Sequence, residues 1–172
     1  MIYDLGPDQG TLSVRTGRKG TVAKAGHDLL IHVTRWRGTV ALGDEPAVTL
    51  DADATSLKVR EGTGGMKALD DGDLANIEQT IDDEVLKRQD IAFRSTRVEK
   101  TADGLSVTGD LTLRGTTRPI AFDLDVAEGR VHGEAVVKQT DWGMKPYTAL
   151  FGALKVADEV RVEIDAQLAQ SR

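Results

Sequence analysis

Cysteine is absent from the 172-residue chain, and this absence excludes several structures and chemistries. The chain can form no disulfide, has no thiolate nucleophile and cannot build a cysteine-based zinc or iron–sulfur site. Aromatic residues are also scarce, at 4% of the sequence, so few bulky side chains are present to fill a wide interior. Any core must be mainly aliphatic, and a chain of this length can bury one without cross-links.

Basic residues are in the minority, and long apolar runs are missing. The chain has 22 Lys and Arg residues against 28 Asp and Glu residues, a net charge of −6, which argues against a nucleic-acid partner. No apolar run approaches the ~20 residues of a transmembrane helix, so we expect no membrane-spanning segment. The opening MIYDLGPDQG has no basic stretch followed by an apolar one. We therefore expect no signal peptide and a cytoplasmic location.

Apolar and polar residues alternate along much of the chain, as half-buried β-strands require. In VRVEIDAQL (160–168) every second residue is apolar and the residues between are polar or charged. Similar runs occupy 105–113, 120–126 and 131–137, with turn signals at 101–104, 114–119 and 127–130. This succession predicts neighbouring antiparallel strands, with Pro119 as the first residue of one of them.

The alternation changes phase at two places in the N-terminal half. One change falls near residues 34–37, and the other falls within VTLDADATSLKV at 48–59. A bulge or bend at each place would exchange the two faces of the strand, as a sheet that curls into a barrel requires. We expect the first bend to place Trp36 at the rim of the barrel or in a dimer contact.

Two segments depart from the β pattern. Around 71–87, Leu74, Ile77, Ile81 and Val85 recur at helical spacing, which predicts a helix inserted between strands. Around 146–153, Pro146 precedes Tyr147, Leu150, Phe151 and Leu154 at similar spacing. This second pattern predicts a short helical turn that covers one end of the barrel.

These patterns predict a single, mainly β domain over residues 1–172, with about eight antiparallel strands in a barrel. Such a barrel is either filled by its own side chains or hollow enough for one small ligand. Small residues at inward positions, such as Gly109, Gly133 and Ala135, leave room for an apolar cavity. The alternative is a tight core in which glycine and alanine mark bends in the sheet.

A hairpin in the second half of the chain resembles the YceI-like, polyisoprenoid-binding family. The resemblance rests on a Phe-x-Ser strand end at Phe93 and Ser95, followed by a Val-x-Gly-x-Leu-Thr-x-x-Gly hairpin over 107–115. The helix before Phe93 and the pair Trp142 and Gly143 also fit, so the resemblance extends over about residues 10–168. It implies a lipocalin-like barrel whose interior holds a polyprenyl or quinone tail, and it is carried by structural rather than catalytic motifs.

Candidate ligand contacts follow from the inward positions together with this resemblance. They are Phe93, Leu111, Leu113, Phe122, Trp142, Tyr147, Leu150, Phe151 and His27. His27 is the only histidine whose strand position points inward, and it is a candidate for binding a lipid head group, although a rim histidine bonded to backbone is the alternative. His32 and His132 are expected to face solvent.

Motifs for catalysis are weak. The glycines of REGTGGMK (60–67) lack the spacing of a phosphate-binding loop, and no G-x-S-x-G elbow is present. We expect no enzyme activity, no cofactor beyond a bound isoprenoid lipid, and no metal site. The leading hypothesis is a carrier or sequestering protein for such a lipid. The alternatives are a barrel with a filled core that mediates homodimerisation or other interactions, and an enzyme that uses His27 or Tyr147 on a hydrophobic substrate.

Overall fold

The computed structural model describes residues 1–19, 28–63, 71–146, 148–149 and 154–170. These residues form a mainly β, antiparallel fold with one α-helix, as the sequence predicts. The strands of the main sheet are β1 (Ile2–Leu5), β2 (Gly10–Arg15), β4 (Asp28–Val33), β5 (Trp36–Ala41), β6 (Ala47–Ala52), β7 (Leu57–Thr63), β8 (Ile91–Lys100), β9 (Gly104–Leu113), β10 (Thr116–Ala127), β11 (Arg130–Lys138), β14 (Glu159–Gln167) and β15 (Ala169–Gln170). A small sheet contains β3 (Arg18–Lys19), β12 (Thr148–Ala149) and β13 (Leu154–Val156).

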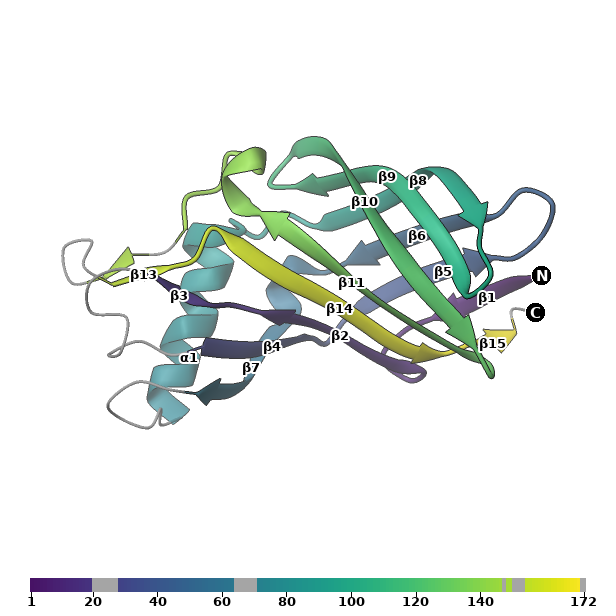
Figure 1. Ribbon diagram of the computed structural model, residues 1–172. Coiled ribbons are helices and arrows are strands. Elements are labelled where there is room, and N and C mark those ends of the chain that lie inside the picture. Colours follow the sequence, from purple (N-terminus) through teal and green to yellow (C-terminus); the bar gives the residue numbers. More distant parts are fainter. Residues whose placement is uncertain (20–27, 64–70, 147, 150–153, 171–172) are drawn as a thin grey trace.

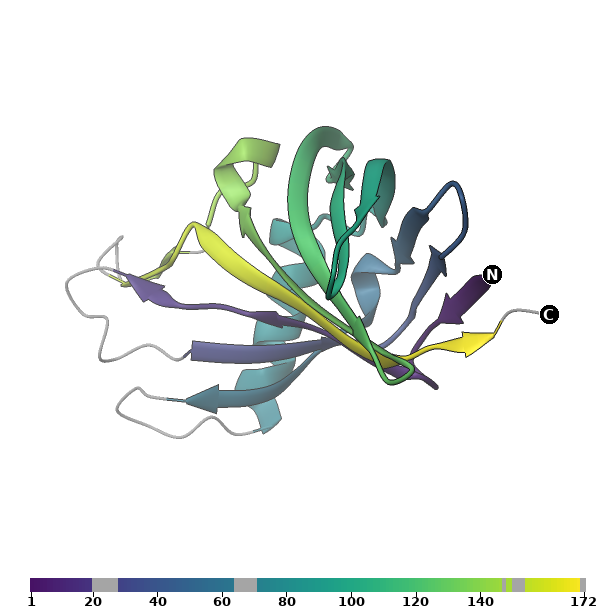
Figure 2. The same ribbon diagram turned by 45° about the vertical axis from the view of Figure 1, so that its right-hand side comes forward.

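The main sheet curls around a common interior, and helix α1 (Asp71–Thr80) lies across one end of it (Figure 1). We call this end the helix end. At the opposite end β1 pairs with β15, which brings the first and last described strands together (Figure 2). We call this second end the terminal end. The order of strands is β15-β1-β5-β6-β8-β9-β10-β11-β14-β2-β4-β7, so β7 is a free edge of the described sheet.

The finer prediction of a lipocalin-like barrel with about eight strands is not confirmed. The described part of the main sheet has 12 strands and the arrangement of a half-barrel. The number is larger partly because β1 and β15 pair with each other near the two ends of the described chain, beyond the predicted runs of alternation.

The hairpin of β9 and β10 shows how the sequence specifies this sheet. The two strands are joined by Arg114 and Gly115, whose φ angles of 49° and 76° are those of a two-residue hairpin turn. Along β9 the predicted inward residues are all buried, and they are Leu105, Val107, Gly109, Leu111 and Leu113. The outward residues Thr108 and Asp110 are exposed.

Pro119 lies inside β10 rather than at its start, because β10 begins at Thr116. It is opposite Asp110 of β9, three residue pairs from the hairpin turn. At that position in an antiparallel pair the backbone nitrogen points away from the partner strand. The other neighbour, β11, pairs with β10 only from Leu124 onward, so the missing N–H of Pro119 breaks no ladder bond.

The predicted changes of face are confirmed at both places in the N-terminal half. β4 ends at Val33 and β5 begins at Trp36, while a 3₁₀ turn, η2 (Ala54–Ser56), separates β6 from β7. The two interruptions are bonded to each other, because the Thr34 amide and hydroxyl both donate to the Ser56 carbonyl oxygen, at 2.9 and 2.7 Å. The prediction for Trp36 is wrong: it is 6% exposed and lies in the core. Two residues between the strands give Trp36 the inward direction.

The predicted helix around 71–87 is confirmed as α1 followed by a π-helical turn, η3 (Ile81–Val85). The predicted helical turn around 146–153 is wrong for the described residues. Thr148–Ala149 forms strand β12 and pairs with β13, and a 3₁₀ turn, η4 (Gln139–Trp142), occurs earlier instead. Backbone pairing with a neighbouring strand satisfies the same groups that a helical turn would, so the apolar spacing does not decide between them.

Candidate functional site

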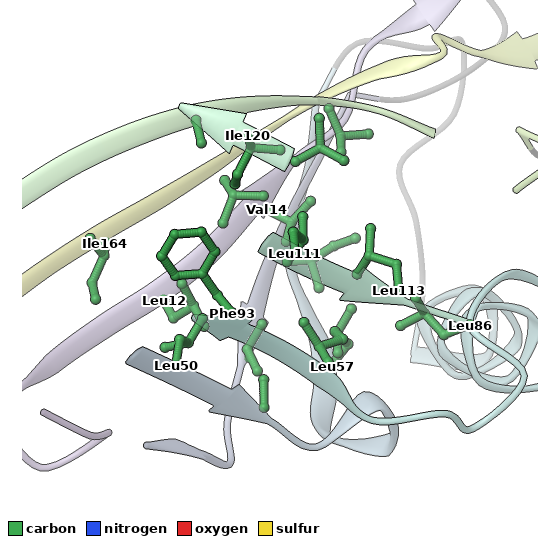
Figure 3. Close-up of a pocket in the computed structure, with 18 of the residues that line it drawn as sticks. Leu12, Val14, Leu50, Leu57, Leu86, Phe93, Leu111, Leu113, Ile120 and Ile164 are labelled. Carbon is green, nitrogen blue, oxygen red and sulfur yellow. The ribbon is translucent and has the colours of Figure 1, made fainter. Parts of the chain in front are cut away.

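The curled sheet encloses a cavity of about 470 Å³. Side chains from strands on all sides point toward this space, as the labelled residues of Figure 3 show. Residues of α1 and η3 complete the lining at the helix end. A filled core is therefore wrong as a description of this fold. The volume is within the range of about 300–1,000 Å³ that is usual for small-molecule sites.

The lining is overwhelmingly aliphatic. Its leucine, isoleucine and valine residues come from most strands of the main sheet, and they include Leu12, Val14, Ile31, Val33, Val40, Val48, Leu50, Leu57, Leu111, Leu113, Ile120, Leu124, Val131, Val162 and Ile164. Small residues predicted to leave room, Gly133 and Ala135, are also part of the lining. Gly109 is buried but is not among the lining residues, because the ring of Phe93 lies over it. A guest in this space would contact mainly hydrocarbon.

The described lining contains one charged residue, Glu134, and its side chain is exposed. Its carboxylate accepts a hydrogen bond from Arg161 at 3.2 Å. Because Glu134 lies between inward-facing Gly133 and Ala135 on β11, its side chain points to the outer face of the sheet. The interior surface is therefore neutral, and an unpaired charge buried there would be strongly unfavourable.

Polar side chains of the lining lie mainly at the helix end. Thr39 and Thr49 are opposite each other on β5 and β6, but each lies between inward-facing residues, so their side chains point to the outer face, where the hydroxyl oxygens are 2.6 Å apart. At the helix end the lining includes Asn76 and Thr80 of α1, together with Gln139 of η4. The Gln139 amide nitrogen donates to the Ala157 carbonyl oxygen at 3.2 Å. The helix end is thus the part of the cavity where polar groups from several elements meet.

Four of the predicted contact residues line the cavity. Phe93 is 3% exposed on β8, and Phe122 is half-buried on β10. Their ring centroids are 5.3 Å apart and the rings are inclined at 55°. Leu111 and Leu113 line the cavity from β9 and are also buried. The alternation of the sequence was enough to predict the direction of all four side chains.

Trp142 is buried at 3% exposure but is not among the residues that line the cavity. Its indole nitrogen donates to the carbonyl oxygen of Leu111 at 2.8 Å. This bond ties the η4 turn to β9, and Met144, two residues later, lines the cavity. Trp142 therefore stabilises the cavity wall through this hydrogen bond without lining the cavity itself.

The remaining predicted contacts lie outside the described residues. They are His27, Tyr147, Leu150 and Phe151. The two other histidines lie on strands, His132 exposed on β11 and His32 half-buried on β4. The prediction that His132 faces solvent is confirmed.

Helix α1 and turn η3 supply lining residues that the sequence analysis did not assign to the site. Ile77, Ile81 and Val85 line the cavity at the helix end, with Leu86 immediately after the turn. Their helical spacing shows which face of the helix is buried. It does not show which space that face covers, because this depends on how the chain crosses the sheet.

The polar face of the same segment carries a perturbed carboxyl group. Burial raises the pKa of the Asp82 carboxyl above its ordinary value, and the nearby Arg88 offsets part of this rise. Asp82 Oδ1 is enclosed and has no hydrogen-bond partner among the described residues. The next residue, Asp83, shows the opposite effect, because hydrogen bonds from Gln79 and Arg88 lower the pKa of its carboxyl.

Within the described ranges, no helix is long and apolar enough to cross a membrane. The same part of the chain contains no group of three or more His, Cys, Asp or Glu residues placed to hold a metal ion.

Comparisons with known proteins agree with this architecture. A family model described as a YceI-like domain matches residues 3–168. The search of curated proteins finds no match. Among solved structures, BcnA of Burkholderia cenocepacia is similar at a TM-score of 0.61 and 15% identity, with 90% of this chain and 94% of that chain covered. The YCEI protein of Campylobacter jejuni is similar at a TM-score of 0.60 and 14% identity, with coverages of 83% and 85%. At these identities the two structures show a shared fold.

Proposed function

Because the chain belongs to the YceI-like family, we propose that it binds the tail of an isoprenoid-type lipid inside the cavity and carries or sequesters that lipid. The guest would be a polyprenyl chain or the tail of a quinone. The observation that supports this most directly is the aliphatic lining of the 470 Å³ space. Removing a hydrocarbon tail from water contributes about 0.8 kcal/mol for each buried CH₂ group, so the tail alone can provide affinity.

The neutral lining supports a tail rather than a charged group as the buried part of the ligand. A phosphate or carboxylate placed among Leu12, Val40 and Val48 would lose its hydration without gaining a partner. A polar head would instead lie at the helix end, where Asn76 and Gln139 can offer hydrogen bonds. The tail would then extend from the helix end toward the terminal end.

The contacts in this proposal are mainly with side chains already predicted from the sequence. Phe93, Leu111, Leu113 and Phe122 would contact the tail along the wall of β8, β9 and β10. Trp142 would not contact the tail itself, but its hydrogen bond to the Leu111 carbonyl oxygen would hold this part of β9 in place. Contacts from His27, Tyr147, Leu150 and Phe151, and a cytoplasmic location, stay predictions from the sequence.

Extraction of the purified protein tests the proposal. The protein is prepared without detergent, extracted with organic solvent and analysed by mass spectrometry. The expected result is a prenyl lipid in stoichiometric amount, or uptake of an added polyprenol by lipid-free protein. A preparation that contains no lipid and takes up no polyprenol would contradict the proposal.

Two neighbouring positions of β10 provide a matched pair of variants. Ile120 is half-buried and lines the cavity, whereas Ala121 is exposed on the outer face. Ile120→Glu places a carboxylate in the apolar interior and should abolish lipid uptake. Ala121→Glu adds the same charge outside and should leave uptake unchanged. Equal uptake by both variants would show that the lipid binds elsewhere.

A further inference from the structure

Two phenylalanine rings lie in the path of a chain that occupies the cavity from the helix end. Phe93 and Phe122 are the aromatic members of the described lining, and their centroids are 5.3 Å apart. In Figure 3 the ring of Phe93 lies in the middle of the space, between Leu113 and Leu86 on one side and Ile164 on the other. Flexible aliphatic side chains form the rest of the wall, so these rings are its largest rigid groups.

Gly109 of β9 leaves room for the first ring and for the close approach of the β8 backbone. It is opposite Ser95 of β8 and Ile120 of β10, so it is adjacent to both phenylalanine positions. A Cβ atom at residue 109 would be only 2.6 Å from Cζ of Phe93. The ring therefore lies over the glycine, in the space that a side chain at 109 would occupy. The ring of Phe122 is in contact with the ring of Phe93, which restricts the freedom of Phe93 to turn aside.

The strand register gives the order in which a chain meets these groups. From the helix end it passes Leu113 and then Leu111, which is opposite Phe93. Phe122 is two inward positions deeper, opposite Val107, with Gly109 between the two levels. The lining continues beyond the rings toward the terminal end, where Val40 and Val48 are paired on β5 and β6. Apolar wall is thus present on both sides of the aromatic pair.

We propose that Phe93 and Phe122 determine the length of prenyl chain that this cavity accepts. The inference depends on the proposed function, because it concerns the depth to which the bound tail extends. A phenyl ring and one isoprene unit contain nearly the same number of carbon atoms. Each ring therefore occupies space that one further isoprene unit would need, and its removal opens the path toward Val40 and Val48.

A series of all-trans prenols that differ by one isoprene unit tests this proposal. Lipid-free protein is titrated with each prenol in competition with a fluorescent apolar dye. Wild-type protein should bind one length best. Phe93→Ala should move that optimum to a prenol one unit longer, and the affinity for the longer prenol should rise about tenfold relative to wild type. The double variant Phe93→Ala/Phe122→Ala should move the optimum by a further unit.

A matched control distinguishes a specific effect on the accepted chain length, which we call the length gauge, from a general weakening of contacts with the cavity wall. Leu113 lines the cavity at the helix end, before the rings. Leu113→Ala should weaken all prenols in parallel and leave the optimum length unchanged. The milder variant Phe122→Leu keeps most of the side-chain volume and should give a smaller shift in the same direction. Thermal unfolding curves identify the variants that are folded. If Phe93→Ala does not fold, Phe122→Leu still tests the proposal.

The possible outcomes separate the two proposals. If wild-type protein binds no prenol of any length, the proposed function itself is wrong. If it binds prenols without a preferred length, or if Phe93→Ala and Phe122→Leu leave the optimum where it was, the length gauge is wrong and lipid binding stands. An equal shift caused by Leu113→Ala would also overturn the role of the rings.

Discussion

At the scale of single residues, Asp82 and Asp83 show that adjacent carboxylates can have opposite effects on stability. Enclosure of Asp82 raises its pKa above the ordinary value of 3.8, so the fold favours the protonated form. Asp83 accepts hydrogen bonds from Gln79 and Arg88, which lower its pKa and favour the charged form. The contribution of Asp82 to stability is thus complete below pH 3.8 and is lost as the pH rises through its folded pKa.

The variant Asp82→Asn should therefore be more stable than the wild type at neutral pH, by less than about 1 kcal/mol because the side chain is only partly buried. The asparagine side chain is neutral at this enclosed position. The gain in stability of the variant over the wild type should disappear below pH 3.8. Urea unfolding at both pH values measures the difference. The neighbouring change Asp83→Asn is the control, and it should not stabilise the protein because it removes a charge that the fold favours. A lower stability of Asp82→Asn at neutral pH would contradict this account.

At the scale of elements, helix α1 is attached to the free edge of the sheet by Glu78. The Val59 amide of β7 donates to Glu78 Oε2 at 2.9 Å, so a helix side chain replaces the missing neighbour strand. Lys58 Nζ is 3.8 Å from the other carboxylate oxygen. Ile77 and Ile81, which are adjacent to Glu78 around the helix axis, line the cavity. The hydrogen bond between Val59 and Glu78 therefore also holds in place helix α1, which closes the helix end of the cavity.

Glu78→Ala should destabilise the protein by about 1–3 kcal/mol, because it leaves the half-enclosed Val59 amide without its partner. The Val59 amide should exchange its hydrogen faster, which NMR-detected hydrogen exchange measures directly. Glu78→Gln keeps an acceptor and should have a smaller effect. Glu84→Ala removes an exposed carboxylate from η3 and serves as a control with little expected change. Unchanged exchange at Val59 in Glu78→Ala would show that the bond does not hold the helix.

Elements differed in how well the sequence predicted them. The hairpin of β9 and β10 followed from alternation and from the turn signal at 114–119, because both signals are local, although the turn itself is only Arg114 and Gly115 and the strand begins at Thr116. The expected turn at 146–153 failed because β12 pairs with β13, a contact that apolar spacing does not encode. Trp36 was misplaced for a related reason, since its direction depends on how two strand interruptions bond to each other.

At the scale of the whole molecule, the interior surface was predictable but the enclosed space was not. Alternation identified which side chains point inward, including Phe93 and Phe122, yet the same pattern fits a filled core. The difference arises from the path of the sheet, which holds opposite walls apart, and from helix α1, which covers one end (Figure 1). Volume is a property of the assembled walls, and no single strand determines it.

An empty apolar cavity lacks the van der Waals contacts that a bound ligand supplies. Ligand binding should therefore raise the stability of the whole molecule. Lipid-free protein should melt at a lower temperature than protein saturated with a prenol. The stabilisation should grow with the logarithm of free ligand concentration and reach about 2.7 kcal/mol at one hundred times Kd. Thermal scans over a range of prenol concentrations measure this dependence. Ala121→Glu should retain it and Ile120→Glu should lose it, because only the second variant places a charge inside. A melting temperature that does not change at saturating prenol would mean that the ligand does not bind the cavity of the folded protein in preference to the unfolded chain.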